Sequence, residues 1–261
     1  MELLSFLRHH SLDGFLPLRA HFEAMERFTC SFRAVEEKAL KHGITPLRYK
    51  RNQKTLSVEN QYTLFNAKVL IVGCGGLGGF VSEMLCRIGV GHLILMDGDV
   101  FEEHNLNRQN FSTIQTLGEP KARVVKAALE AINPALHVDA FEVFFDFSLH
   151  VNLLDDVDVV VDALDEPSLK CHLASWCKEH HKPFVHGAIA GHYAQFSTCD
   201  TLEHLYSQEG KGAEIFLGNP SFTACFAASI QSAEVIKLLL GWKHLETPLF
   251  ADLLEYELTL L

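Results

Sequence analysis

The sequence predicts a mixed α/β, Rossmann-like fold: a mostly parallel sheet with flanking helices, antiparallel C-terminal strands and a small helical N-terminal extension. Two observations support this prediction. Apolar strand-like runs alternate with helical runs from residue 68 to residue 186, and such alternation requires crossover helices between parallel strands. A glycine-rich turn, Gly73–Cys74–Gly75–Gly76–Leu77–Gly78, joins the first strand to the first helix. Such a turn lets backbone N–H groups and a helix N-terminus approach a phosphate.

The expected elements follow in the order that this fold requires. Strands are predicted at Lys68–Val72, His92–Asp97, His137–Phe145, Val157–Asp162, Pro183–His186, Gln195–Cys199 and Leu249–Leu261, and helices at Gly76–Ile88, Glu119–Ile132, Pro167–His181 and Phe222–Leu240. The helix at 119–132 has the clearest signals, because Pro120 stands near its start and Asn133–Pro134 ends it.

The pattern of apolar residues in the sequence changes near Pro46. Before it, apolar residues at partly helical spacing predict two or three short helices. We therefore expect residues 1–46 to form a helical N-terminal extension and residues 47–261 to form the nucleotide-binding domain.

Composition favours a cytoplasmic enzyme. The 261 residues carry a net charge of -11, which opposes binding to a nucleic-acid backbone. No apolar run approaches the roughly 20 residues that a membrane helix needs, and the N-terminus has no signal-peptide pattern. Seven irregularly spaced cysteines suit a reducing compartment better than a disulfide framework.

Polar residues at and after the end of the second predicted strand indicate which kind of ligand the chain binds. Asp97 ends that strand, where its carboxylate can accept hydrogen bonds from ribose hydroxyls. The run Asn105–Leu106–Asn107–Arg108–Gln109 has no role in a dehydrogenase and suits a triphosphate.

Together these motifs resemble those of the ThiF/MoeB/HesA adenylyltransferases, which are similar to the adenylation half of ubiquitin-activating enzymes. The resemblance covers about residues 48–261. It rests on Arg48–Tyr49–Lys50–Arg51, the glycine turn, Asp97–Gly98–Asp99, Asn105–Gln109, Gly118–Glu119–Pro120–Lys121, Asp162–Ala163–Leu164–Asp165, Gly187–Ala188, Gln195 and the run 231–237.

The resemblance implies that ATP, with Mg²⁺, activates the C-terminal carboxylate of a small ubiquitin-like or sulfur-carrier protein that ends in Gly-Gly. It assigns the phosphates to Asn105, Arg108 and Lys121 with help from Gln109, the ribose to Asp97 and Mg²⁺ to Asp165. Arg51 matches an arginine that reaches the triphosphate of the neighbouring subunit in this family, so a homodimer is implied. The full nucleotide-binding set is Gly73, Gly75, Gly76, Gly78, Asp97, Asp99, Asn105, Arg108, Gln109 and Lys121, and the residues expected to act in catalysis are Arg108, Lys121, Asp165 and Arg51.

Plainer roles remain open for single residues. Lys121 can be a solvated lysine, and Asp165 can be an N-cap of the following helix. Arg108 can pair with a surface carboxylate, and the asparagines can form turns. At the level of function, three alternatives remain. They are an NAD-dependent oxidoreductase, a tRNA-modifying relative that activates a carboxylate on a nucleoside, and a non-catalytic protein that only docks a partner.

Cysteines and histidines are not expected to bind metal. The paired Cys-x-x-Cys motifs of a structural zinc site are missing from the sequence, so we expect no structural zinc. Cys171 and Cys177 are expected to pack on one helix, and Cys74 to fill space in the glycine turn. The segment Lys211–Gly218 before the last helix contains no cysteine, and Cys199 is the nearest candidate for a covalent intermediate. The histidines show no metal-binding spacing joined to a carboxylate motif.

Overall fold

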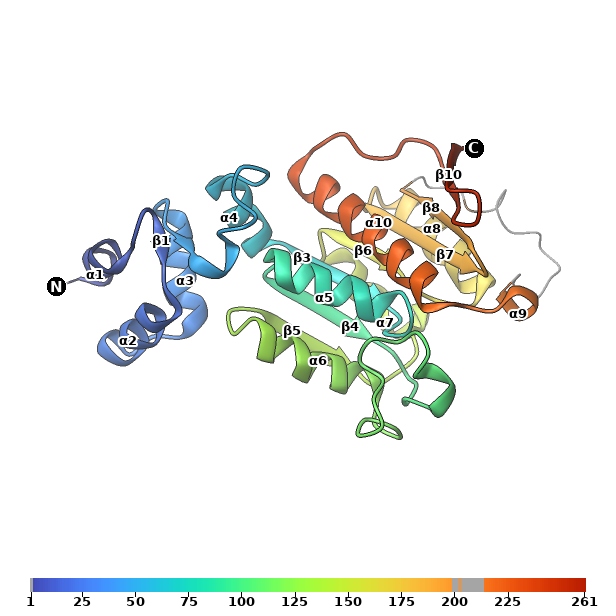
Figure 1. Cartoon of the computed structure of the whole chain (residues 1–261), viewed down its shortest axis with the longest axis horizontal. Coiled ribbons are helices and arrows are strands. Elements are labelled where there is room, and N and C mark those ends of the chain that lie inside the picture. Colours follow the sequence, from blue (N-terminus) through green and yellow to red (C-terminus); the bar gives the residue numbers. More distant parts are fainter. Residues whose placement is uncertain (1, 199–201, 203–213) are drawn as a thin grey trace.

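The computed structural model describes residues 2–198, 202 and 214–261. Its core is an eight-stranded sheet in the order β10-β9-β8-β7-β6-β3-β4-β5 (Figure 1). The strands are β3 (Lys68–Val72), β4 (His92–Met96), β5 (His137–Phe141), β6 (Val159–Asp162), β7 (Phe184–Ala190), β8 (Tyr193–Ser197), β9 (Leu249–Asp252) and β10 (Glu257–Leu260).

Five strands, β7, β6, β3, β4 and β5, pair in parallel, and β8, β9 and β10 continue the sheet antiparallel from β7. The predicted fold class is confirmed. The helices of this domain are α4 (Val58–Asn66), α5 (Gly78–Ile88), α6 (Lys121–Ile132), α7 (Phe147–Asp155), α8 (Pro167–Glu179), α9 (Glu214–Leu217) and α10 (Ser221–Leu240).

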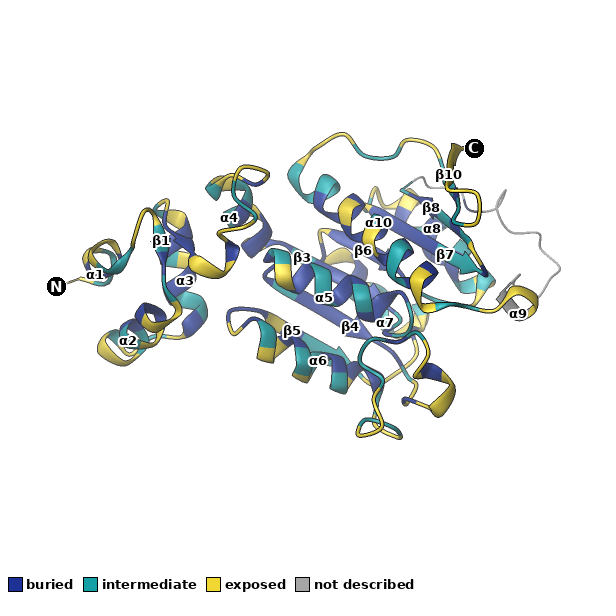
Figure 2. Cartoon of the chain, in the orientation of Figure 1, coloured by how far each residue is buried: buried dark blue, intermediate teal, exposed yellow. Residues whose placement is uncertain are grey.

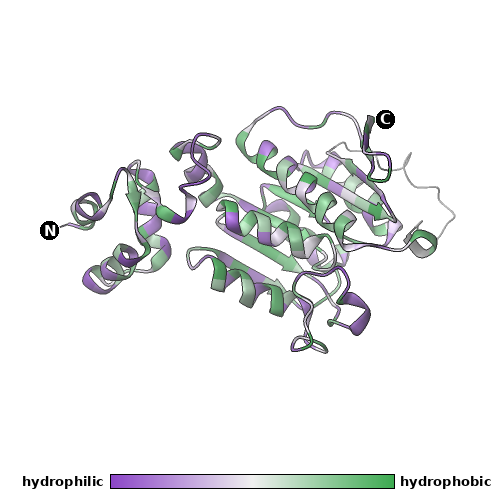
Figure 3. Cartoon of the chain, viewed as in Figure 1, coloured by the Kyte–Doolittle hydropathy of each residue, from purple (hydrophilic) through white to green (hydrophobic). Residues whose placement is uncertain are grey.

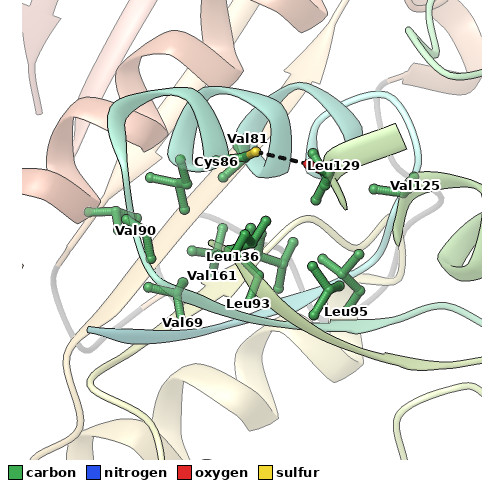
Figure 4. Close-up of a cluster of buried hydrophobic side chains, with 14 of the residues drawn as sticks. Val69, Val81, Cys86, Val90, Leu93, Leu95, Val125, Leu129, Leu136 and Val161 are labelled. Carbon is green, nitrogen blue, oxygen red and sulfur yellow. Dashed lines mark hydrogen bonds between the residues drawn. The ribbon is translucent and has the colours of Figure 1, made fainter. Parts of the chain in front are cut away.

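Helices cover both faces of the sheet. Side chains of α5, α6 and α10 pack on one face, on alternate strand residues such as Val69 and Leu93, and Figure 4 shows part of this core. There the Cys86 thiol of α5 donates to the Leu129 carbonyl of α6 at 3.5 Å. Side chains of α7 and α8, among them Leu154 and Cys177, pack on the other face. Strands β3, β4, β6 and β7 are therefore mainly buried on both faces and mostly hydrophobic, whereas the edge strand β5 is only partly buried (Figures 2 and 3).

Residues 3–46 form a smaller unit with its own core. Three helices, α1 (Leu3–His10), α2 (Leu18–Phe28) and α3 (Phe32–Lys41), surround a two-stranded parallel pair, β1 (Phe15–Leu16) and β2 (Thr45–Pro46). Arg33 joins this unit to the sheet domain, because its guanidinium donates to the carbonyls of Gly91, Ala135 and Phe65. The helical content of the extension is confirmed, and the boundary after residue 46 stays a prediction.

The structure also corrects several predicted elements. The strand predicted at 137–145 ends at Phe141 and is followed by α7. Helices α4, α7 and α9 were not predicted from the sequence. The single closing strand predicted at 249–261 is two strands, because residues 253–256 form a turn in which Tyr256 has a positive φ of 59°. The part of the predicted strand at residue 199 lies outside the described residues.

One helix contradicts the expectation that no apolar run approaches membrane-spanning length. Helix α10 has 20 residues and is long and apolar enough, by length and composition, to cross a membrane. Half of its most apolar window is buried inside the structure, where it packs on α5 and the sheet. Its apolar composition is explained by this central position in the core.

Candidate functional site

A cleft of about 1000 Å³ opens at the carboxyl ends of the parallel strands. Open α/β sheets bind ligands at this edge. Nine predicted site residues line the cleft: Gly73, Gly75, Gly76, Asp97, Asp99, Arg108, Gln109, Lys121 and Asp165. Residues from the connections β3–α5, β4–α6 and β6–α8 and from the start of α6 therefore converge on one space.

The glycine turn closes tightly against its surroundings. Gly73 has a φ of 99°, and a Cβ there would lie 2.5 Å from the carbonyl oxygen of Ala163. At Gly78, the first residue of α5, a Cβ would lie 1.8 Å from the carbonyl oxygen of Gly73. Gly78 therefore does not line the cleft but lets the turn fold back on the helix. Gly75 and Gly76 remain facing the ligand space.

Asp97 holds the glycine turn in place. Its Oδ2 accepts a hydrogen bond from the backbone N–H of Cys74 at 2.7 Å, and its Oδ1 accepts one from the N–H of Asp99 at 2.8 Å. Burial raises the pKa of Asp97, and these two hydrogen bonds and the charge of Lys121 oppose the rise. Each oxygen retains a lone pair, so the carboxylate can also accept from a ribose hydroxyl.

Lys121 is a buried cation at the cleft wall. Its side chain is only 8% exposed, and its Nζ lies 3.0 Å from Oδ2 of Asp99. The backbone N–H of Lys121 also donates to the Asp99 carbonyl at 3.0 Å. A solvated lysine is therefore the wrong description of Lys121.

Arg108 and Asp165 both line the cleft, but they do not form an ion pair with each other. The Arg108 guanidinium donates to the His104 carbonyl at 3.0 Å and to Asn107 Oδ1 at 2.8 Å. Within the described ranges, no carboxylate oxygen lies within 4.0 Å of an Arg108 nitrogen, the limit for an ion pair. The alternative that Arg108 pairs with a surface carboxylate is therefore not supported. Burial lowers the pKa of Arg108, and the negative charge of Asp165 opposes that effect.

Asp165 does not cap the next helix. The residue at the N-cap of α8 is Glu166, and Pro167 occupies the first turn. Asp165 is exposed and makes no hydrogen bond to the part of the chain that the structure describes. Its carboxylate is therefore available for a ligand or a cation.

Amide side chains supply unsatisfied polar atoms at the cleft. Gln109 Oε1, Gln195 Nε2 and Asn219 Oδ1 are buried and have no hydrogen-bond partner among the described residues, and all three residues line the cleft. Buried polar groups are costly unless they are paired. These atoms therefore fit a polar ligand such as a nucleotide, with the cationic Lys121 and Arg108 at the same wall.

Two predicted residues lie away from the cleft. Asn105 is buried in a short 3-10 helix, Glu103–Asn105, where its Oδ1 accepts from the Glu102 backbone N–H at 2.9 Å. In this chain it therefore organises the loop that presents Arg108 and Gln109. Arg51 is exposed in a turn before α4 and is not among the residues that line the cleft.

A buried ionic network lies under the cleft and was missed from the sequence. Lys170 of α8 donates to both oxygens of Asp162 and to the Gly187 carbonyl, and His186 Nδ1 lies 2.6 Å from Asp162 Oδ2. Burial alone would raise the pKa of Asp162, but the Lys170 charge and the His186 bond outweigh it and lower that pKa. Burial lowers the pKa of His186. A signal was present, because Lys170 shares a helix face with the buried Leu173, Ala174 and Cys177.

The cysteines behave as packing residues where they are described. Cys74 and Cys177 are buried in the two sheet cores, and Cys171 packs against the second. Burial raises the pKa of the Cys74 thiol well above its usual range. Cys199 and residues 211–213 lie outside the described residues.

Comparison with known proteins assigns the chain to a family. A protein-family model described as "ThiF family" matches residues 49–259. The chain belongs to the ThiF family. The match begins after the N-terminal unit, so the family describes the sheet domain and its cleft.

Curated relatives of this ThiF-family chain include adenylyltransferases. It is 30% identical over 207 residues to the molybdopterin-synthase adenylyltransferase of Escherichia coli, with 75% of this chain and 83% of the relative covered. It is 32% identical to the sulfur carrier protein adenylyltransferase of Thermus thermophilus, with 76% and 78% covered. It is also 34% identical to the tRNA threonylcarbamoyladenosine dehydratase of Bacillus subtilis, with 53% of this chain and 55% of the relative covered.

The chain spans about a third to just over half the length of several curated relatives, including that dehydratase. Among solved structures, E. coli MccB has a TM-score of 0.70 and 24% identity, with 82% of this chain and 68% of MccB covered. This similarity shows that the two proteins share a fold.

Proposed function

We propose that this ThiF-family chain uses ATP to adenylate the C-terminal carboxylate of a small ubiquitin-like or sulfur-carrier protein with a Gly-Gly tail, releasing pyrophosphate. The observation that carries the proposal is the convergence of Asp97, Arg108, Lys121 and Asp165 on one cleft. The names of the E. coli and T. thermophilus relatives support the adenylyl transfer and the kind of carrier.

The chemistry needs little from the protein beyond alignment and charge. A carboxylate oxygen of the carrier attacks the α-phosphorus of ATP, the bond between the α-phosphorus and the bridging oxygen breaks, and pyrophosphate leaves with the electron pair. The carboxylate is ionised at neutral pH, so no general base is required. Lys121 and Arg108 would neutralise the charge of the phosphates, and such interactions are strongest where water is excluded.

Mg²⁺ fits the exposed carboxylate at the mouth of the cleft. Asp165 would hold it, and the cation would supply further neutralisation of phosphate charge. An oxygen ligand that makes no bond to the described residues matches the ligand preference of this cation.

The cleft also has room for the second substrate. Its volume of about 1000 Å³ lies at the upper end of the usual range for ligand pockets, roughly 300–1,000 Å³. The wall opposite the cations is formed by β7 and β8, through residues such as Ala188, Tyr193 and Gln195. An extended tail without side chains would pass along this wall to reach the nucleotide.

The alternative functions fit these observations less well. An NAD-dependent oxidoreductase leaves Lys121, Arg108 and Asp165 without a role. A docking protein without catalysis has no use for cations directed into a cleft. A tRNA-modifying activity is opposed by the net charge of -11.

The proposal also includes a role for Arg51 and a homodimeric assembly. Arg51 is exposed and outside the cleft, so it would act on the nucleotide of a neighbouring copy in a cytoplasmic homodimer. Asn105 would support the phosphate site through the position of its loop.

Calorimetric titration tests the nucleotide assignment. ATP with Mg²⁺ should bind saturably to the parent protein and more weakly to Lys121→Ala, and NAD should not bind. Arg123→Ala is the matched control, because Arg123 lies on the same helix, is 57% exposed and pairs with Glu119 away from the cleft. Saturable NAD binding without any response to ATP would contradict the proposed function.

A further inference from the structure

Two histidines and an aspartate meet at the edge of the sheet opposite the cleft. His92 and His137 are the first residues of β4 and β5, and they are direct partners in the parallel register of these strands. Asp139 stands two residues after His137, so its side chain points to the same face. The strand pairing therefore brings together residues that are 45 positions apart in the sequence.

The geometry of this His92–His137–Asp139 cluster is compact. His92 Nε2 lies 2.8 Å from Asp139 Oδ2, and His137 Nε2 lies 3.2 Å from Asp139 Oδ1. One ligand atom from each residue falls within 4.8 Å of the other two. Tetrahedral zinc with bonds of about 2.0–2.2 Å separates its ligand atoms by roughly 3.4 Å, close to these distances.

Two lysines act on the cluster through their charge, because Lys68 lowers the pKa of His92 and Lys126 lowers that of Asp139. Both have other partners: Lys68 pairs with Asp156, and Lys126 donates to the Val138 carbonyl at 2.8 Å. Burial lowers the pKa of His92, and the hydrogen bond to Asp139 opposes that effect. The side chains of His137 and Asp139 are 56% and 42% exposed, which leaves a path to solvent.

We propose that His92, His137 and Asp139 form a binding site for a divalent transition-metal ion such as Zn²⁺, with water completing the coordination. Two imidazoles and one carboxylate match zinc, whereas Mg²⁺ prefers oxygen ligands alone. The site differs in place and chemistry from the phosphate cleft, and from the paired-cysteine zinc site that the sequence lacks. The sequence shows no metal-binding spacing of histidines joined to a carboxylate motif, and these two histidines come to lie beside Asp139 only through the pairing of β4 with β5.

The bound ion would cross-link β4 to the edge strand β5. This is the region where the N-terminal unit docks, because Arg33 binds the carbonyls of Gly91 and Ala135, each close in sequence to a ligand. Metal binding should therefore raise the thermal stability of the protein, since the ion binds only the folded arrangement.

The test uses tag-free, chelator-treated full-length protein without nucleotide. Titration with Zn²⁺ should show one site, and Co²⁺ should give the visible absorption of a low-coordinate site. Removing even an outer-shell partner typically costs about 10- to 100-fold in metal affinity, so His137→Ala and Asp139→Asn should weaken Zn²⁺ binding at least that much.

Two controls keep the result interpretable. His9→Ala removes an exposed histidine outside the cluster and should bind Zn²⁺ like the parent. Circular dichroism of His137→Ala and Asp139→Asn without metal should match the parent, and Asp139→Asn, which keeps the shape of the side chain, covers the case in which His137→Ala misfolds. The proposal is overturned if Zn²⁺ does not bind, or if it binds equally to the parent and to both cluster variants. The assay involves no ATP, so its outcome is independent of the proposed adenylation.

Discussion

Lys121 Nζ lies 3.0 Å from Asp99 Oδ2, and the backbone N–H of Lys121 donates to the carbonyl of the same aspartate. The cation at the start of α6 is thus held by the loop that follows Asp97. Because Lys121 is nearly buried, its ammonium group is fixed at the cleft wall before any phosphate arrives. This pre-organisation is the basis of the first prediction.

Lys121→Ala and Arg108→Ala should each slow carrier-dependent exchange of labelled pyrophosphate into ATP. The loss should be about two to three orders of magnitude, the usual effect of removing one donor from a transition-state charge clamp. Arg123→Ala should exchange at the parent rate, and thermal unfolding of the variants should stay near that of the parent. Parent-like rates in both cleft variants would show that the phosphate assignments are wrong.

Asp165→Asn tests whether Asp165 is a metal ligand. Since Glu166 occupies the N-cap of α8, this change should leave stability unaltered. Exchange activity should fall strongly, because the amide carries no charge to hold Mg²⁺. Glu166→Gln is the neighbouring control and should retain activity. An Asp165→Asn enzyme with unchanged dependence on Mg²⁺ would remove Asp165 from the metal site.

Arg51 is tested by mixing two inactive variants. If Arg51 acts on the neighbouring site, a heterodimer of Arg51→Ala and Asp165→Asn contains one site with both residues intact. Mixing should therefore restore part of the exchange activity, whereas mixing Arg51→Ala with Lys50→Ala, Arg51→Ala double-variant chains should restore none. The trans role fails if heterodimers are shown to form and the mixture stays inactive.

His21 gives the N-terminal unit a defined pH dependence. Burial lowers its pKa from 6.5 to about 4, while its Nδ1 bonds the Pro17 carbonyl and its ring faces Glu36 and Arg48. The unfolded chain binds a proton at His21 more readily than the folded chain does, so stability present above pH 6.5 is lost as pH falls toward 4. The loss should be about 2–3 kcal/mol, at 1.36 kcal/mol for each pKa unit.

Urea denaturation at pH 7.5 and 4.5 measures this effect. His21→Asn, whose amide can keep the bond to Pro17, should show a smaller loss on acidification than the parent. His10→Asn is the matched control, because His10 makes the same kind of bond to the Phe6 carbonyl but is 32% exposed. An equal loss of unfolding free energy between pH 7.5 and pH 4.5 for the parent and His21→Asn would contradict the assignment to His21.

The fold of the sheet domain could be predicted because the sequence signals for it lie in short, continuous stretches of the chain. The glycine turn, Asp97 and Lys121 each stand at a strand end or helix start, and the parallel topology brings such ends to one edge. Helix α7 was missed because its apolar residues continue those of β5 without a break that the sequence makes obvious. The sequence did not indicate that Asn105 lies outside the cleft lining, because a buried loop asparagine and a phosphate ligand look alike in sequence.

Residues that meet only through register or packing could not be predicted. His92 and His137 become neighbours through the pairing of β4 with β5, which no local pattern encodes. The Asp162–Lys170–His186 network likewise joins two strands and a helix. Lys170 was the exception, because a lysine on an apolar helix face was visible in the sequence.

Pyrophosphate exchange with a defined carrier tests the central claim most directly. The parent protein should exchange labelled pyrophosphate into ATP only with Mg²⁺ and a small Gly-Gly-ending carrier, the first candidate being one encoded beside this chain. The same carrier with its C-terminal carboxylate converted to an amide should support no exchange, because the nucleophile is lost. Exchange that persists with the amidated carrier, or that fails with a full panel of Gly-Gly-ending carriers despite intact ATP binding, would contradict the account.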